Sequence, residues 1–231
     1  MADKQMTFFD HLGELRKRLT RIVLALLIFS SIGYVYAFRI LDFLKARLPD
    51  ITITYQSLME PFMAKFKLGV LFGFIMSTPI IFYQILSFLA PALKGKEKRL
   101  LYPMVAMMVV LFMMGASVGY YYVLPVGAEW LLAQDEGELV RLLNVSQFIS
   151  FTTLFIIAFG VAFETPVALI ILMKLKIVSR ERLRQNWRVA YVSLLVISAM
   201  ATPDWSLPPM LIMSAFMIFL YEFTLIIARW I

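Results

Sequence analysis

The sequence predicts an all-α integral membrane protein with six transmembrane helices, both termini in the cytoplasm, a short fifth span and a capped outer face. Of its 231 residues, 61% are hydrophobic and 16% are charged, whereas soluble domains average about 45–50% and about 25%. The mean hydropathy is +0.83, and the positive charges gather between long apolar runs. We expect residues 1–231 to form one membrane domain.

Six apolar runs approach the roughly 20 residues that a helix needs to cross about 30 Å of hydrocarbon. They cover residues 22–38, 68–89, 103–124, 148–173, 189–202 and 209–228. The first run lacks a small-residue cleavage site, so we expect it to remain as an anchor. The fifth would reach only about 21 Å, so either the bilayer thins there or the turn after it, which carries Asp204, lies at membrane depth.

The distribution of positive charge predicts the orientation. Sixteen lysines and arginines fall on the side of the apolar runs that holds both termini, and six fall on the other side. The positive-inside rule therefore places both termini in the cytoplasm. We expect a multi-pass protein of the cytoplasmic (inner) membrane.

The segment before the first span carries a helical amphipathic pattern. Its apolar residues recur at spacings of four, three and four: Phe8, Leu12, Leu15 and Leu19. Charged residues fill the opposite face, and among them Glu14 and Arg18 are spaced for an ion pair across one turn. We expect this segment to lie along the cytoplasmic interface.

Three outer segments predict the cap. Residues 40–48 continue a helical pattern after the first span, whereas residues 51–61 alternate and end at a proline, as in an extended loop. Residues 129–148 predict two short amphipathic pieces that separate at Gly137. We expect these segments to cover the outer face together.

The residue inventory excludes several kinds of chemistry. There is no cysteine, and His11 is the single histidine, so disulfides, thiolate sites and a zinc site built on a histidine pair are excluded. No phosphate-binding loop motif is present, and we expect no cofactor. The net charge of +7 surrounds the spans, which favours membrane lipids over nucleic acid. An aspartyl-protease-like pair of Glu164 and Asp204 is an alternative, but no local motif supports an enzyme.

Glu164 interrupts the fourth apolar run near its middle. It lies ten residues, or about 15 Å along a helix, before Lys174. An acid at this depth costs about 2.5–3.5 kcal/mol on insertion and usually faces a cavity or a partner. Pro166 cannot donate to the carbonyl of Ala162, so we expect the helix to open there. The structural alternative is a protonated or hydrogen-bonded Glu164 that only joins helices.

Other polar residues within or beside the spans have simpler interpretations. For Gln84 we expect a hydrogen bond between helices. Glu222 lies about 10 Å from the end of the last span, where a structural pairing and a functional role are both open. Glu97 lies among four lysines and arginines, and could be an ordinary solvated loop charge.

Four motifs, in chain order, resemble those of the TatC family of twin-arginine protein translocase subunits. They are HLGELRKRL (11–19), PIIFYQILSFLAPALKGKEKR (79–99), FGVAFETPVA (159–168) and LYE (220–222). The resemblance covers essentially the whole chain. It implies a receptor for twin-arginine signal peptides that assembles with the single-span partners TatA and TatB, homo-oligomerises in a larger complex, and exports folded proteins under the proton-motive force.

The resemblance also assigns residues to two sites. Those for the signal peptide are Glu14, Arg16, Phe88, Leu93, Glu97 and Arg99. Those at membrane depth, where a partner helix would dock, are Gln84, Glu164, Pro166, Asp204 and Glu222. Two alternatives stay open: a proton-coupled secondary transporter in which Glu164 titrates, and a purely structural scaffold.

Overall fold

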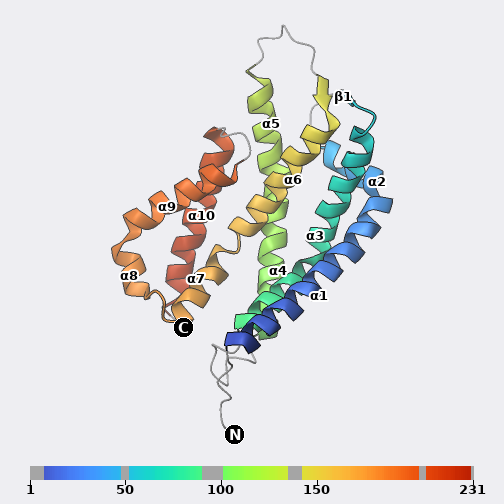
Figure 1. The fold of residues 1–231 in the computed structure, drawn as a ribbon. Helices are drawn as coiled ribbons and strands as arrows, with labels where there is room; N and C mark the ends of the chain where they lie inside the picture. Colours follow the sequence, from blue (N-terminus) through green and yellow to red (C-terminus); the bar gives the residue numbers. More distant parts are fainter. Residues whose placement is uncertain (1–7, 48–51, 90–100, 135–141, 203–206, 230–231) are drawn as a thin grey trace.

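The computed structural model describes residues 8–47, 52–89, 101–134, 142–202 and 207–229 (Figure 1). In these residues the elements are α1 (Phe8–Val35), α2 (Ala37–Lys45), β1 (Thr52–Thr54), α3 (Glu60–Leu89), α4 (Leu101–Val118), the π-helix η3 (Gly119–Val123), α5 (Leu124–Leu132), β2 (Leu142–Asn144), α6 (Val145–Ala162), α7 (Thr165–Lys174), α8 (Arg180–Gln185), α9 (Trp187–Ala201) and α10 (Leu207–Ile227). The start of α1 and the end of α10 lie at the same end of the bundle, called here the termini end (Figure 1).

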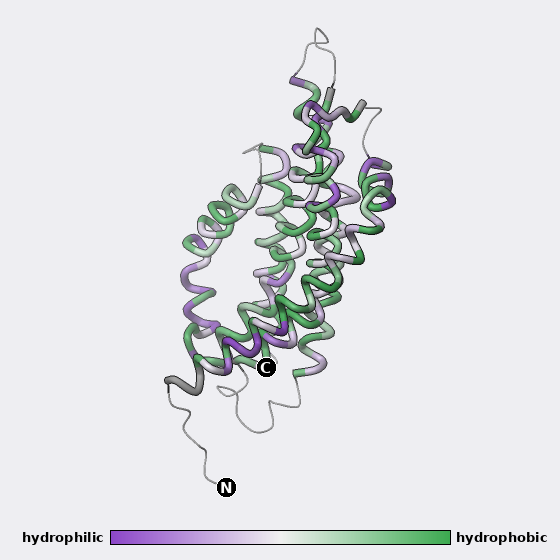
Figure 2. Tube along the Cα trace, turned by 45° about the vertical axis from the view of Figure 1, so that its right-hand side comes forward, coloured by the Kyte–Doolittle hydropathy of each residue, from purple (hydrophilic) through white to green (hydrophobic). Residues whose placement is uncertain are grey.

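Five helical stretches of the described chain are long and apolar enough to cross a membrane. They are Leu12–Val35, Glu60–Phe88, Leu101–Leu132, Val145–Lys174 and Leu207–Ile227. α9 is apolar but has only 15 residues, as expected for a short fifth span. Figure 2 shows hydrophobic residues along most of these helices and hydrophilic residues on α8 and towards helix ends. The all-α membrane class is thus confirmed.

α1 packs mainly against α3, and glycines bring the two backbones together. A Cβ on Gly69 would lie 2.8 Å from the carbonyl oxygen of Ser30, and one on Gly33 would lie 2.7 Å from the Cβ of Phe72. Both distances are below any normal contact, so only glycine fits at these positions. The face of α1 turned away from α3 is exposed, as a lipid-facing helix requires.

The predicted position of the N-terminal amphipathic segment is wrong in one respect. Residues from Phe8 onward do not form a separate piece lying across the interface, because α1 runs without a break from Phe8 to Val35. No proline or other helix breaker separates Leu19 from the first span, so the helix simply continues. The break comes later, at Tyr36, and residues 37 and 38 belong to α2 rather than to the first span.

Close packing of α4 on α6 forms the centre of the bundle. Phe112 and Phe159 are fully buried there, and a Cβ on Gly160 would lie 2.5 Å from the ring of Phe112. The third span lengthens beyond its predicted end, because α4, η3 and α5 follow one another directly from Leu101 to Leu132. This long helix runs through the bundle from the termini end to the opposite end (Figure 1).

The opposite end is closed by α2 and a short parallel sheet. β1 pairs with β2 in the register Thr52 opposite Leu142, which confirms extended chain within residues 51–61. Residues 142–144 are strand, whereas the sequence predicted a short amphipathic piece after Gly137 without specifying its secondary structure. Pairing with β1 satisfies the backbone of this segment, and the helix begins only at Asn144, whose side chain accepts from the amides of Ser146 and Gln147.

Candidate functional site

The first candidate cluster joins α1 to α3 towards the termini end. The Arg18 guanidinium donates to Oε1 of Glu14 through Nε at 3.0 Å and also through Nη2, and its Nη1 donates to Oε1 of Gln84 at 3.2 Å. The pair expected from the spacing of Glu14 and Arg18 is therefore confirmed, as is the interhelical hydrogen bond expected for Gln84. Arg18 holds both partners at once.

One oxygen of this cluster is left without a partner. Oε2 of Glu14 is buried and accepts no hydrogen bond from any described residue, although the side chain as a whole is 21% exposed. A buried carboxylate oxygen without a donor is unfavourable. Glu14 can therefore take a second donor, and a guanidinium suits it best because it offers paired N–H groups.

The other residues predicted for the signal peptide are placed only in part. Phe88 is half-buried near the end of α3, and Arg16 is exposed on α1, on the same helix as Glu14. Leu93, Glu97, Arg99 and, from the membrane-depth set, Asp204 lie outside the described residues. Of the predicted residues, Glu14 and Gln84 are brought together, and Arg18, which neither predicted site included, joins them.

The second candidate site is Glu164, at the break between α6 and α7. Both of its carboxyl oxygens are buried and lack a hydrogen-bond partner among the described residues. α6 ends at Ala162 and α7 begins at Thr165, so the predicted opening of the helix at Pro166 is confirmed. The carbonyl that Pro166 cannot satisfy accepts the Thr165 hydroxyl at 2.6 Å. The structural alternative, in which a protonated or hydrogen-bonded Glu164 only joins helices, stays a prediction.

Glu222 differs from Glu164 because it has a partner. The Tyr191 hydroxyl on α9 donates to Oε1 of Glu222 on α10 at 2.7 Å, which ties the short helix to its neighbour. Tyr221 beside it donates to the carbonyl of Leu183 at 2.9 Å, again across to the α8–α9 segment. The structural pairing considered for Glu222 is thus present.

Two cationic contacts were not predicted from the sequence. Lys67 on α3 donates to the hydroxyls of Ser146 and Ser150 on α6 at 2.7 and 2.8 Å. The signal was available, since the two serines are four residues apart and share a helix face. Arg180 donates through Nε to the carbonyl of Leu225 at 3.0 Å, a common role for a cation at a helix C-terminus.

The described residues contain no group of three or more histidines, cysteines or acids that could hold a metal ion. What they offer instead is hydrogen-bond acceptors: one free carboxylate oxygen at Glu14 and two at Glu164. Both sites are suited to binding a donor group, such as a guanidinium or a polar side chain of another helix.

Comparisons with known proteins find one family along nearly the whole chain. The family model described as "Sec-independent protein translocase protein (TatC)" matches residues 10–215. The Sec-independent protein translocase protein TatC of Carboxydothermus hydrogenoformans is 34% identical over 100% of this chain and 96% of its own length. That of Aquifex aeolicus is 33% identical over 97% of this chain and 95% of its own length.

A solved structure is also similar across the whole fold. The crystal structure of the twin-arginine translocase receptor TatC in DDM superposes with a TM-score of 0.81 at 33% sequence identity, covering 94% of this chain and 98% of that chain. A second crystal structure of the same receptor gives a TM-score of 0.80 at 32% identity. The helices, their order and the motifs resemble this family along nearly the full length. The chain belongs to the TatC family of Sec-independent protein translocase proteins.

Proposed function

We propose that this chain is the receptor subunit that binds twin-arginine signal peptides of folded cargo at the cytoplasmic face of the inner membrane. The observation that carries the proposal is the free oxygen of Glu14, which lies in the HLGELRKRL motif beside a guanidinium that Glu14 already binds. A carboxylate that holds one arginine in this way has the geometry to hold another.

The proposed peptide site extends from Glu14 to the loop after α3. An arginine pair needs carboxylates within bidentate reach, which Glu14 and Glu97 would supply, with Arg16 and Arg99 beside them in their motifs. The apolar residue next to the arginines needs a hydrophobic surface, for which Phe88 is half-buried and Leu93 follows in the sequence. Two acids on separate elements would favour a peptide with two arginines over one with a single cation.

Glu164 forms the second part of the proposal, as the docking point for a partner helix. Its two oxygens are buried and without donors in the described chain, and in a membrane such a group favours a donor from another helix. The carbonyl of Ala162, which Pro166 cannot satisfy, already accepts the Thr165 hydroxyl. A polar side chain of a single-span subunit such as TatA or TatB would complete the site, with Gln84, Glu222 and Asp204 as further polar groups at membrane depth.

The proposal further includes six spans in one domain with both termini in the cytoplasm, self-association within a larger complex, and dependence on the proton-motive force. Six helices enclose no pathway wide enough for a folded protein, so the pathway requires other subunits. Because the chain has no phosphate-binding loop motif, the energy for export would come from the membrane gradient.

Reconstituted export tests this function. The chain is placed in proteoliposomes with TatA and TatB, and a folded fluorescent protein is offered with a twin-arginine or a twin-lysine signal peptide. We expect protease-protected cargo only with the twin-arginine peptide, and none after an ionophore collapses the gradient. Equal protection of both cargoes would contradict the receptor function. Proton-coupled flux of a small solute in liposomes that contain the chain alone would favour the transporter.

A further inference from the structure

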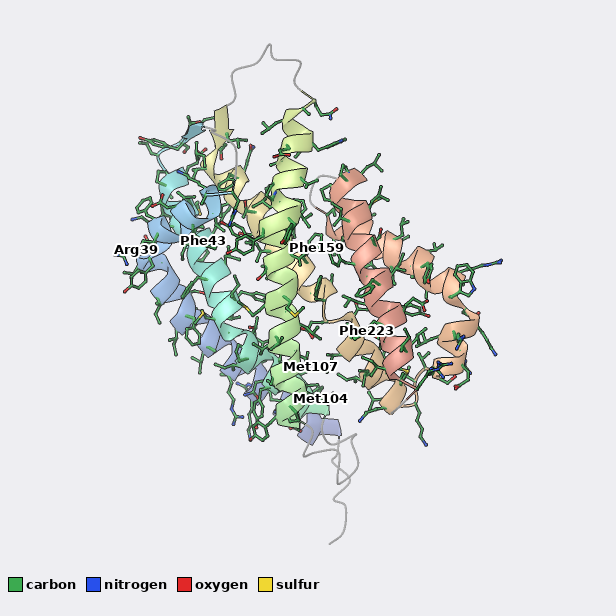
Figure 3. All side chains as sticks on the ribbon, turned by 180° about the vertical axis from the view of Figure 1, so that it is seen from behind. Arg39, Phe43, Met104, Met107, Phe159 and Phe223 are labelled. Carbon is green, nitrogen blue, oxygen red and sulfur yellow. The ribbon has the colours of Figure 1, made fainter. Side chains whose placement is uncertain are left out.

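An apolar cavity of about 580 Å³ lies between α4, α7 and α10, towards the termini end. Its wall is made by side chains of all three helices, among them Met104, Met107, Ile170, Phe223 and Ile227. Figure 3 shows Met104 and Met107 on α4 and Phe223 on the neighbouring α10. The cavity is distinct from the Glu14 cluster and does not include Glu164.

The cavity wall offers almost no hydrogen-bonding group to an occupant. The Thr224 hydroxyl lies on it but already donates to the carbonyl of Leu220 at 2.6 Å. Among the described residues, Lys174 at the end of α7 is the one charged residue on the wall. An occupant that fits must therefore be hydrocarbon along most of its length and anionic at one end.

Lys174 also lines a second, smaller hollow of about 240 Å³, together with Ser179 and Arg180. Ile170 is shared by both hollows, so the two are adjacent and meet beside Lys174. Both cations, Lys174 and Arg180, line the smaller hollow. Arg180 donates through Nε to the carbonyl of Leu225 and makes no other hydrogen bond to a described residue. Its remaining N–H groups are available to an anion.

Neither cation has an anionic partner in the described chain. The ion pair found there joins Glu14 to Arg18, and Lys174, which is half-buried, makes no hydrogen bond to a described residue. Residues 174–188 contain six lysines and arginines and one acid, Glu181, which is exposed on α8.

We propose that these two hollows form a binding site for one anionic phospholipid, with an acyl chain in the cavity between α4, α7 and α10 and the phosphate between Lys174 and Arg180. An apolar cavity of a membrane protein that ends at cations without an anionic partner among the described residues matches such a lipid in both polarity and charge. A free phosphate would leave the cavity empty, and a partner helix would leave the cations without a counter-charge. The site is independent of signal-peptide binding and does not rest on the proposed function.

Native mass spectrometry of the full chain, released from nanodiscs of mixed phosphatidylglycerol and phosphatidylcholine, tests the head-group preference. We expect one retained lipid, enriched in phosphatidylglycerol, and a roughly fivefold loss of this enrichment in Lys174→Gln. The matched control is Arg184→Gln, which removes an exposed α8 cation outside both hollows and should retain the enrichment. Equal retention of the two lipids by the wild type, or an unchanged Lys174→Gln, would overturn the proposal.

A second variant tests the acyl-chain cavity without touching the cations. Met107→Trp fills the cavity from a position that is 40% exposed, so the fold should tolerate it, and we expect loss of the retained lipid whatever its head group. Met113→Trp, on the same helix but outside the cavity, should retain the lipid. If Met107→Trp still retains the lipid, the acyl chain does not lie in this cavity and the proposal is wrong.

Two competitors distinguish the lipid from other occupants. Inorganic phosphate at millimolar concentration should not displace the lipid, because the acyl chain anchors it. Displacement by phosphate would show a head-group site alone, and displacement by an added single-span partner would show that the cavity is the partner's seat. Either result would overturn the assignment to lipid.

Discussion

At the scale of single residues, Arg18 already binds the carboxylate that an incoming guanidinium would use. It binds one oxygen of Glu14 and reaches Gln84 on α3, so the cluster is partly satisfied before any ligand arrives. If the signal peptide binds at Glu14, its arginine must share this carboxylate with Arg18 or replace it. The affinity for the peptide then depends on how firmly Arg18 is held.

Arg18→Gln tests this competition. We expect the affinity for a twin-arginine peptide to rise by up to about fivefold, since a partly exposed ion pair contributes about 0–1 kcal/mol. Isothermal titration of the purified chain with the peptide measures the change. Lys17→Gln removes an exposed cation one residue away on the same helix and should leave the affinity unchanged. A large loss of binding in Arg18→Gln would mean that Arg18 supports the site rather than competing for it.

Substitutions of Glu164 should change the association with a partner helix without destabilising the fold. Because its oxygens make no hydrogen bond in the described chain, Glu164→Ala should leave the free energy of unfolding unchanged or higher. The Glu164→Ala chain should co-purify with less of a single-span partner than the wild type does. Glu164→Gln, whose side chain can still bind a donor, should retain part of this association. Peptide binding serves as the control and should not change. A Glu164→Ala chain that fails to fold would restore the structural role.

At the scale of helices, one local device recurs at three threonine–proline pairs. Thr78, Thr165 and Thr202 each precede a proline, and each hydroxyl donates to the carbonyl three residues earlier, at 2.8, 2.6 and 3.2 Å. That carbonyl is the one that the proline cannot satisfy. The outcomes differ: α3 continues through Pro79, whereas α6 ends before Pro166. Because the threonine hydroxyl satisfies the carbonyl that the proline leaves free, the helix can either continue or end at the proline without leaving that carbonyl unpaired in the membrane.

Thr165→Val removes the hydroxyl with little change of shape. We expect a loss of about 1–3 kcal/mol in the free energy of unfolding, because the Ala162 carbonyl is left without a donor in an apolar setting. Unfolding in mixed micelles titrated with SDS measures this change. Thr165→Ser keeps the donor and should recover most of the loss. Equal stability of the two variants would show that water or a shifted backbone supplies the bond instead.

The contact between α1 and α3 makes a second prediction at this scale. Gly69→Ala places a methyl group 2.8 Å from the carbonyl oxygen of Ser30, so the helices must move apart, at about 1–3 kcal/mol. Gly13→Ala, on α1 with no atom within 4 Å of the added group, should be neutral or stabilising by roughly 0.5–1 kcal/mol. The same SDS titration compares them. Equal effects at the two glycines would contradict backbone contact between α1 and α3.

At the scale of the whole molecule, apolar length and proline position predicted much of the architecture. They predicted the membrane class, the short helix α9 and the break between α6 and α7. They did not predict the unbroken α1, because an amphipathic pattern indicates a helix but not the angle at which it joins the next one. The strand at 142–144 was missed because it depends on pairing with residues 52–54, far away in the sequence.

For the candidate sites, the sequence predicted single residues but not most of their partners. Glu14 was assigned only through the resemblance of its motif to the TatC family, whereas Gln84, Glu164 and Glu222 stood out because charged and amide groups are costly in or near a membrane. Their partners did not, since the bonds from Arg18 to Gln84 and from Tyr191 to Glu222 join separate helices. Spacing within one helix predicts neighbours four residues apart, but only the packed bundle brings distant helices into contact.

The central claim is that the chain recognises an arginine pair through carboxylates at the termini end. The most direct test is equilibrium binding of a fluorescent twin-arginine peptide and its twin-lysine variant to the purified chain in nanodiscs. We predict a preference of about tenfold for arginine, because a lysine cannot make the bidentate bond. The preference should disappear in Glu14→Gln and in Glu97→Ala but persist in Glu181→Gln, which removes an exposed acid on α8. Equal affinity of the wild type for the two peptides would contradict the account.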